Sequence, residues 1–118
     1  MSDVISWVVE LAIKPGQLDD FKAVVEEMVQ STRNEPGTQA YEWFLSEDNT
    51  TCHVCERYAD SPATMAHLGT FGEKFAERLM ATSDLQRFTV YGAPNDEVKS
   101  VLGGFGAVFM GQLNGFDR

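Results

Sequence analysis

The stretch EPGTQAYEWFLSEDNTTCHVCERYADSPATMAH at residues 35–67 decides the fold. Residues 38–46 and 51–59 are rich in aromatic and β-branched side chains, a composition that is typical of strands. The short polar connection at residues 47–49 predicts that the two strands form an antiparallel hairpin. Asp-Ser-Pro at residues 60–62 then predicts the start of a helix, with the serine as its cap and the proline at its first position.

Further elements are expected on both sides of this hairpin. Residues 4–13 are rich in β-branched residues and almost continuously apolar, which predicts a strand covered on both faces. From Leu18 onward, apolar residues recur every three or four positions, which predicts a helix with one apolar stripe. The helix after the hairpin is expected to bend or break at Gly69 and Gly72, and residues 86–93 are predicted to form the last strand.

The order strand, helix, strand, strand, helix, strand predicts an α+β fold of the ferredoxin-like βαββαβ type. In this fold an antiparallel sheet carries both helices on one face. The 118 residues suit a single domain, with a core at about residues 4–93 and an extension at residues 94–118. The second face of the sheet then has no helix left to cover it.

The extension is expected to contain a short helix at residues 96–102, followed by the uncharged stretch GGFGAVFMGQLNGF at residues 103–116. Soluble proteins avoid exposing an uncharged apolar segment of this kind. We therefore expect this segment to pair with or pack upon a second subunit, which predicts a homodimer. The alternative is that the segment folds back on the edge of its own sheet.

The charge balance excludes several classes of partner. Nine Lys and Arg residues against eighteen Asp and Glu residues give a formal charge of −9 and an isoelectric point near 4.5. Nucleic acids and anionic membranes both require clustered cations, so neither is an expected partner. Because residues 4–13 lack the pattern of a secretory signal and no stretch is long enough to span a membrane, we expect a cytoplasmic protein.

Cys52 and Cys55 resemble a metal or redox motif by their spacing. In a strand, however, an offset of three sends two side chains to opposite faces, so the two thiols can neither share an ion nor form a disulfide. We expect both thiols to be buried as small apolar groups. His53 is expected to be solvated, and Arg57 is expected to pair with a surface carboxylate.

Residues of the same stretch also form an ordered motif. Its elements are a Pro-Gly turn, an aromatic strand, an acidic turn, a strand ending in Glu-x-Tyr, and an Asp that opens a helix carrying a histidine. The positions are Pro36, Gly37, Tyr41, Asp48, Glu56, Tyr58, Asp60 and His67. This set resembles the core of the antibiotic-biosynthesis-monooxygenase family over about residues 4–93. The resemblance implies a dimeric α/β barrel, in which two sheets press face to face and each subunit has a pocket between its sheet and its helices.

Family resemblance implies the activity only in broad terms, because known members include cofactor-free oxygenases, haem-degrading enzymes, quinol oxygenases and an isomerase. The expected function is that of a cofactor-independent monooxygenase acting on a small aromatic or quinol substrate. The alternatives are a non-catalytic dimeric domain that binds a small hydrophobic metabolite, and a non-redox enzyme such as an isomerase. Haem-degrading members place an axial histidine where this chain has Glu77, a poor ligand for haem iron. The two histidines also lie far apart in the sequence without a supporting ligand pattern, so no cofactor or metal is expected.

His67 is the expected catalytic residue. It lies four residues before Phe71, so both share the helix face that points at the sheet. An imidazole has an unperturbed pKa of about 6.5, so this side chain is suited to act as a base or to orient a phenol. The alternative is a structural histidine that is hydrogen-bonded to a strand, with Glu56 as its partner.

The pocket that binds the substrate is expected to be flat and apolar. Tyr41 and Trp43 are two residues apart and share one face of their strand, where they can form its wall and supply polar tips. They are also suitable core residues, as is Trp7. The expected substrate-binding residues are Trp7, Tyr41, Trp43, Glu56 and Phe71.

Overall fold

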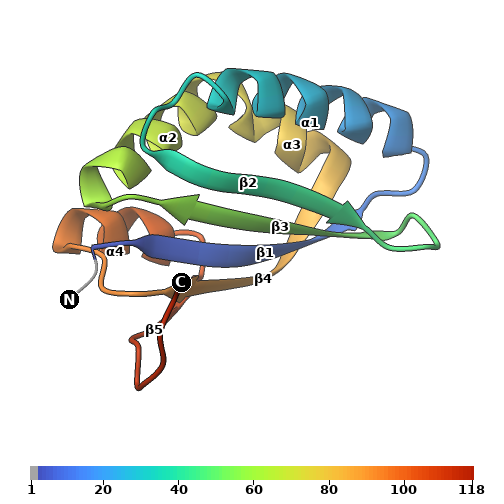
Figure 1. Cartoon of the computed structure of the whole chain (residues 1–118). Coiled ribbons are helices and arrows are strands. Elements are labelled where there is room, and N and C mark those ends of the chain that lie inside the picture. The colour runs from blue at the N-terminus through green and yellow to red at the C-terminus, as the bar shows by residue number, and fades with distance from the viewer. Residues whose placement is uncertain (1–2) are drawn as a thin grey trace.

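The computed structural model describes residues 3–118. The elements are β1 (Ile5–Ile13), α1 (Leu18–Thr32), β2 (Thr38–Leu45), β3 (Thr51–Tyr58), α2 (Ser61–Lys74), α3 (Ala76–Thr82), β4 (Ser83–Tyr91), α4 (Asp96–Gly103) and β5 (Val108–Met110). Helices α1, α2 and α3 lie together on one side of the sheet (Figure 1). The predicted order of elements and the α+β ferredoxin-like class are confirmed. No helix within residues 3–118 is both long and apolar enough to cross a bilayer.

The sheet has the strand order β2-β3-β1-β4-β5. The pairs β2–β3, β3–β1 and β1–β4 are antiparallel, whereas β4 and β5 are parallel. The expectation of a wholly antiparallel sheet is therefore wrong at one edge. Helix α4 carries the chain back along β4, so that β5 runs beside the last three residues of β4 in the same direction. A crossover of this kind produces parallel pairing. Within one chain the sheet is open and does not close into a barrel.

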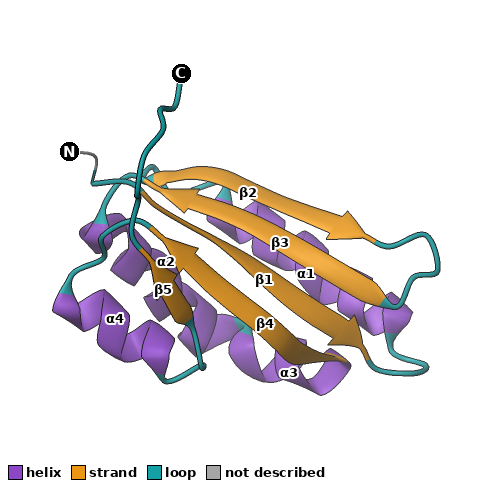
Figure 2. Ribbon diagram, turned by 90° about the horizontal axis from the view of Figure 1, so that it is seen from below, coloured by secondary structure: helices purple, strands orange, loops and turns teal. Residues whose placement is uncertain are grey.

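The extension therefore follows the alternative interpretation in part, because residues 108–110 pair with the edge of their own sheet. Residues 111–118 then leave this edge and remain exposed (Figure 2). Asp117 in this tail accepts a hydrogen bond of 2.6 Å from the guanidinium of Arg57. The predicted pairing of Arg57 with a surface carboxylate is confirmed.

The core lies between the sheet and the helices, and the alternation along β3 shows which side of the strand faces it. Cys52, Val54, Glu56 and Tyr58 are buried, and His53 between them is exposed. Cys52 and Cys55 thus lie on opposite faces, as predicted. The expectation that both thiols are buried is wrong for Cys55, because its face of the sheet carries no helix and leaves it partly exposed (Figure 2).

Local details of the second helix differ from the predictions. The cap of α2 is Asp60, not the predicted serine, because the Asp60 carboxylate accepts a hydrogen bond of 2.8 Å from a first-turn amide. The break falls at Phe75 rather than at Gly69 and Gly72, since Phe75 turns into the core at φ −126°.

Strand β4 begins at residue 83, three residues earlier than expected, and it continues through an irregularity in its pairing with β1.

Candidate functional site

A cavity of about 80 Å³ lies between the inner face of the sheet and helices α2 and α3. This volume is large enough for more than a single water molecule. All six residues expected from the sequence lie on its wall, namely Trp7, Tyr41, Trp43, Glu56, His67 and Phe71. Residues from β1, β2, β3 and α2 therefore converge on one space, because the inward faces of the strands and the inward face of the helix meet there.

Most of the wall is apolar and aromatic. The ring of Trp7 packs edge-on against Phe88 with ring centroids 5.5 Å apart, and Tyr41 packs in the same way against Trp43 at 5.7 Å. Phe88 was not expected at the site, although its position on the inward face of a strand is a signal that could have suggested it. Such a wall favours a flat apolar ligand over a flexible polar one.

Two further residues mark where the cavity meets solvent. Met80 on α3 is 42% exposed, and Phe105, in the connection between α4 and β5, is 38% exposed. Neither was expected at the site. Because Phe105 belongs to the extension, this part of the chain contributes directly to the wall of the cavity.

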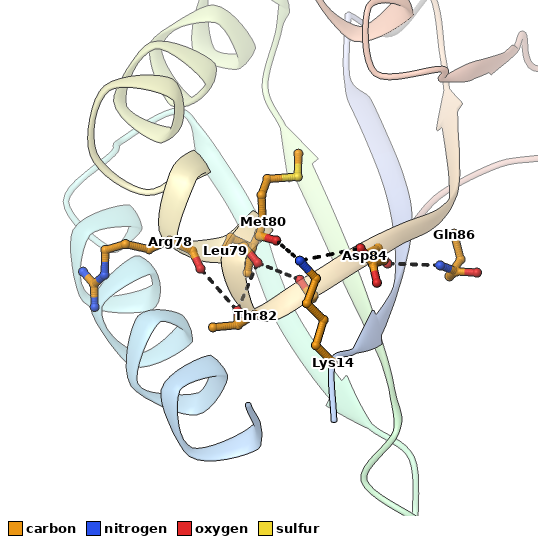
Figure 3. Close-up of polar contacts among 8 residues, drawn as sticks. Lys14, Arg78, Leu79, Met80, Thr82, Asp84 and Gln86 are labelled. Carbon is orange, nitrogen blue, oxygen red and sulfur yellow. Dashed lines mark hydrogen bonds and ion pairs between the residues drawn. The ribbon is translucent and has the colours of Figure 1, made fainter. Parts of the chain in front are cut away.

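The rim near Met80 is held by a set of hydrogen bonds (Figure 3). The ammonium group of Lys14 donates to the main-chain oxygen of Met80 at 2.9 Å and lies 3.9 Å from the Asp84 carboxylate. The hydroxyl groups of Thr82 and Ser83 both donate to the main-chain oxygen of Leu79, at 3.0 and 2.9 Å. The lysine and the two hydroxyl groups thus donate hydrogen bonds to main-chain oxygens at the C-terminal end of α3, which would otherwise lack partners within the helix. These bonds fix this side of the cavity.

His67 connects two carboxylates. Its Nδ1 lies 2.9 Å from Oε1 of Glu35, and its Nε2 lies 3.4 Å from Oε1 of Glu56. The imidazole is only 5% exposed, and its ring lies 5.3 Å from that of Tyr41. The structural alternative named Glu56 as the hydrogen-bond partner, whereas the hydrogen bond is made to Glu35 and Glu56 lies within ion-pair distance. The same side chain also lines the cavity. Glu35 was not expected from the sequence.

Glu56 is the buried carboxyl group of the site. Burial raises its pKa above the usual value, and the nearby imidazole of His67 and the hydroxyl of Tyr58 oppose this rise. The Tyr58 hydroxyl donates to Oε1 of Glu56 at 2.5 Å. The indole of Trp7 lies close enough to lower the pKa of Glu56 as well, although its Nε1 forms no hydrogen bond. Glu56 is thus suited to hold a proton in the folded protein.

The phenols and indoles supply donors. Burial, with the negative charge of Glu56 second, raises the pKa values of Tyr41 and Tyr58, so both phenols keep their protons. The Nε1 atoms of Trp7 and Trp43 are buried without a hydrogen-bond partner among the described residues. Unpaired buried donors are costly, so these groups favour a ligand that presents an oxygen acceptor.

Among residues 3–118, no Lys or Arg lines the cavity, whereas Glu56 lines it and Glu35 contacts His67. A bound carboxylate or phosphate would therefore lose its hydration without a Lys or Arg to pair with. The site is suited to an uncharged ligand.

The remaining chemically notable residues lie elsewhere. His53 is on the bare face of the sheet, where its Nε2 lies 3.2 Å from Glu10. Burial raises the pKa of the Cys52 thiol to about 11. Glu77 is exposed on α3 and does not line the cavity. Residues 3–118 contain no group of three or more His, Cys, Asp or Glu side chains arranged to hold a metal ion.

Comparisons with known proteins agree with this architecture. The crystal structure of MupZ from Pseudomonas fluorescens matches with a TM-score of 0.87 at 23% identity, over 99% of this chain and 96% of that one. SnoaB, a cofactor-independent oxygenase from Streptomyces nogalater, matches with a TM-score of 0.67 at 18% identity, over 80% of this chain and 96% of that one. A conserved protein from Methanosarcina mazei Go1 matches with a TM-score of 0.66 at 20% identity, over 75% of this chain and 90% of that one.

The likeness to MupZ includes the extension, whereas the likeness to SnoaB covers a smaller share of the chain. At these identities the structural matches establish the fold alone. Among curated proteins, no sequence matches this chain significantly. The family model described as antibiotic biosynthesis monooxygenase matches residues 4–83, which is more than half of the sequence. The chain therefore belongs to the antibiotic biosynthesis monooxygenase family.

Proposed function

We propose that this protein transfers protons to and from a small, uncharged, largely apolar molecule bound in the cavity. We propose further that it does so as a cofactor-independent monooxygenase of an aromatic or quinol substrate. The observation that carries the proposal is the meeting of His67 Nε2 and Glu56 at the wall of an otherwise apolar cavity. Family membership and the description of SnoaB as a cofactor-independent oxygenase support the oxidative form of the reaction.

The proposed roles follow from the contacts. His67, held by Glu35 on one side, presents Nε2 to the cavity as the base that takes a proton from the substrate. Glu56 can receive this proton or return it to a later intermediate, because its burial favours the protonated form. To the Tyr41 hydroxyl and the two indole N–H groups we assign the donation of hydrogen bonds to oxygen atoms of the substrate, because all three side chains line the cavity and the indole N–H groups have no partner among the described residues. The apolar wall excludes water and keeps the substrate oriented.

In the oxidative reaction, removal of a proton makes a phenol electron-rich enough to pass one electron to dioxygen. The radical pair then combines, so that a ring C–O bond forms and the carbon carries a peroxide. Cleavage of the O–O bond releases one oxygen as water, which takes the hydrogen of the former ring C–H and the phenolic hydrogen. The second oxygen stays on the ring, and a phenol plus dioxygen thereby gives a quinone plus water.

An oxygen electrode with a panel of dihydroxynaphthalenes tests the oxidative proposal. We expect oxygen uptake above the rate of autoxidation, and we expect the His67→Gln variant to lose most of this excess. His53→Gln is the matched control, since it changes the other histidine of the chain, which lies on the bare face of the sheet. Equal uptake with and without protein across the panel would exclude the monooxygenase function for this substrate class.

A second candidate is a non-redox enzyme, such as an isomerase, on the same scaffold. The pairing of a histidine with a buried carboxyl group favours it, because a base and an acid suffice to move a proton between two substrate positions. Anaerobic exchange of ring hydrogens of the same compounds with D₂O measures the proton step alone. Exchange without oxygen uptake supports this second candidate. If neither hydrogen exchange nor oxygen uptake is observed, the result favours a non-catalytic domain that binds a small hydrophobic metabolite.

We also propose that the protein works as a homodimer. The sheet carries helices on one face only (Figure 2). Exposed apolar side chains lie on strands β2, β4 and β5 and in the tail. They include Phe44, Tyr91, Val108 and Leu113. Burying a surface of this kind in water is favourable. Sedimentation at micromolar concentration should give a dimer, and a monomer would contradict the proposal.

A further inference from the structure

Glu35 lies outside the wall of the cavity but is connected to it through His67. It is located in the turn between α1 and β2, and its side chain is only 17% exposed. Its Oε1 atom receives two hydrogen bonds of 2.9 Å, one from the Thr38 hydroxyl and one at Nδ1 of His67. The main-chain N–H of Thr38 also donates to the main-chain oxygen of Glu35 at 3.2 Å. Contacts within its own turn therefore hold the carboxylate in place independently of its contact with His67.

This contact determines which nitrogen of His67 carries the proton in the neutral ring. A carboxylate oxygen only accepts hydrogen bonds, so an Nδ1 at 2.9 Å must carry a hydrogen to form one. The other neutral form would place the lone pair of Nδ1 against the Glu35 oxygen. With the hydrogen on Nδ1, the lone pair of Nε2 is directed towards Glu56, which also lines the cavity. Burial favours the protonated form of Glu56, and a protonated carboxyl group does not repel this lone pair.

We propose that Glu35 is the positioning residue of this site: it holds the proton on Nδ1 of His67 and keeps Nε2 as the nitrogen that exchanges protons with a bound molecule. The first part of this statement concerns the protein alone. The second part rests on the function proposed above. Glu35 does not touch the bound molecule, and it acts through the orientation and protonation of the imidazole.

The chain contains a natural comparison for this pair. Its second histidine, His53, also contacts a glutamate, Glu10, on the neighbouring strand β1. That contact is made through Nε2 at 3.2 Å, and its side chains are 49% and 35% exposed. Water competes for both groups there, so the contact should have a much weaker effect on where the proton sits. Both histidines can be observed in the same sample.

The test is a long-range ¹H–¹⁵N correlation spectrum of the imidazoles, recorded on the whole chain over a pH series. We expect neutral His67 to carry its proton on Nδ1 in the wild-type protein. In Glu35→Gln the new amide can donate as well as accept, so the population should shift towards the form protonated on Nε2. Thr38→Val is the matched control, because it removes the other hydrogen bond to the same oxygen and keeps the carboxylate.

Two results would overturn the proposal: a wild-type His67 protonated on Nε2, or a Glu35→Gln spectrum in which His67 keeps its proton on Nδ1. The first needs no variant, so the proposal stays testable even if Glu35→Gln does not fold. Glu10→Gln should alter the signals of His53 alone, and unchanged His53 signals in Glu35→Gln would show an intact fold.

The D₂O exchange assay then separates the two proposals. If Glu35 positions a working base, Glu35→Gln should slow exchange by about 10–100-fold, by analogy with the groups that orient metal-binding histidines. Exchange that is absent in the wild-type protein would contradict the proposed function, while the imidazole spectrum would still decide the role of Glu35. Exchange that is present in the wild-type protein and unaffected in Glu35→Gln would contradict the positioning role alone.

Discussion

Replacement of Glu56 by Gln should change how the stability of the protein depends on pH. Burial raises the pKa of Glu56 above the ordinary value of 4.5, against the opposing effects of His67 and Tyr58. Below pH 4.5 the carboxyl group is protonated in both states, so it contributes no slope. Above this pH the unfolded chain releases the proton while the folded protein keeps it. The contribution of Glu56 to the free energy of unfolding therefore falls as pH rises.

The size of this effect follows from proton linkage. A difference of one bound proton corresponds to about 1.4 kcal/mol per pH unit, which is the steepest slope that Glu56 can contribute. The slope ends once pH exceeds the raised pKa of the folded state, because both states are then ionised. Glutamine has nearly the same shape and does not titrate. The free energy of unfolding of the wild-type protein minus that of Glu56→Gln should therefore be greatest at acidic pH. This difference should decrease between pH 4.5 and the raised pKa of Glu56 in the folded state.

Urea unfolding followed by tryptophan fluorescence provides the measurement, since Trp7 and Trp43 report on the core around the cavity. Titrations at intervals of about half a pH unit from about pH 4 to about pH 9 cover the window. Glu10→Gln serves as the control, because Glu10 also contacts a histidine but lies on the bare face of the sheet. A stability difference for Glu56→Gln that is constant with pH, or that increases as pH rises, would refute the reasoning.

Three further predictions concern single side chains. Tyr58→Phe should lower the free energy of unfolding by about 1–3 kcal/mol, because it removes the hydroxyl that donates to buried Glu56; a loss below about 0.5 kcal/mol in urea unfolding would contradict this. Asp60→Ala should cost about 1 kcal/mol, because it removes the cap of α2, and an unchanged urea midpoint would show that the cap is dispensable. In a Cys55→Ser background, the Cys52 thiol should react with iodoacetamide at pH 8 only as fast as the protein unfolds, because it is buried and its pKa is raised to about 11. Labelling that is faster than unfolding would contradict the burial of the Cys52 thiol.

Much of the fold could be predicted because its elements depend on local patterns. Alternation along residues 51–58 places Cys52 and Cys55 on opposite faces whatever the strand packs against. The same argument places Tyr41 and Trp43 on one face, and helical spacing places His67 with Phe71. These inward-facing residues were also the predicted site residues, which is why all of them line the same cavity.

The edge strand β5 could not be predicted from a pattern. It contains three residues, and its sequence lacks the alternation of a half-buried strand. Its partner depends on the point to which α4 returns the chain. The same packing brings Phe105 to the cavity, and no local periodicity indicates that contact.

Glu35 was missed for a related reason. In the sequence it precedes Pro36 and Gly37, and it looks like one polar residue of a turn. It lies 32 positions before His67, and only the packing of α2 against the connection between α1 and β2 brings the two side chains to 2.9 Å.

The sequence by itself determined the types and order of the central elements and the face on which each side chain lies, because backbone geometry repeats over two residues in a strand and 3.6 in a helix. Tertiary structure alone decided the parallel fifth strand, the cavity and the two carboxylates that contact one imidazole. Those features depend on distances between elements far apart in the chain. Such distances are set when the apolar faces pack together, and no local pattern encodes them.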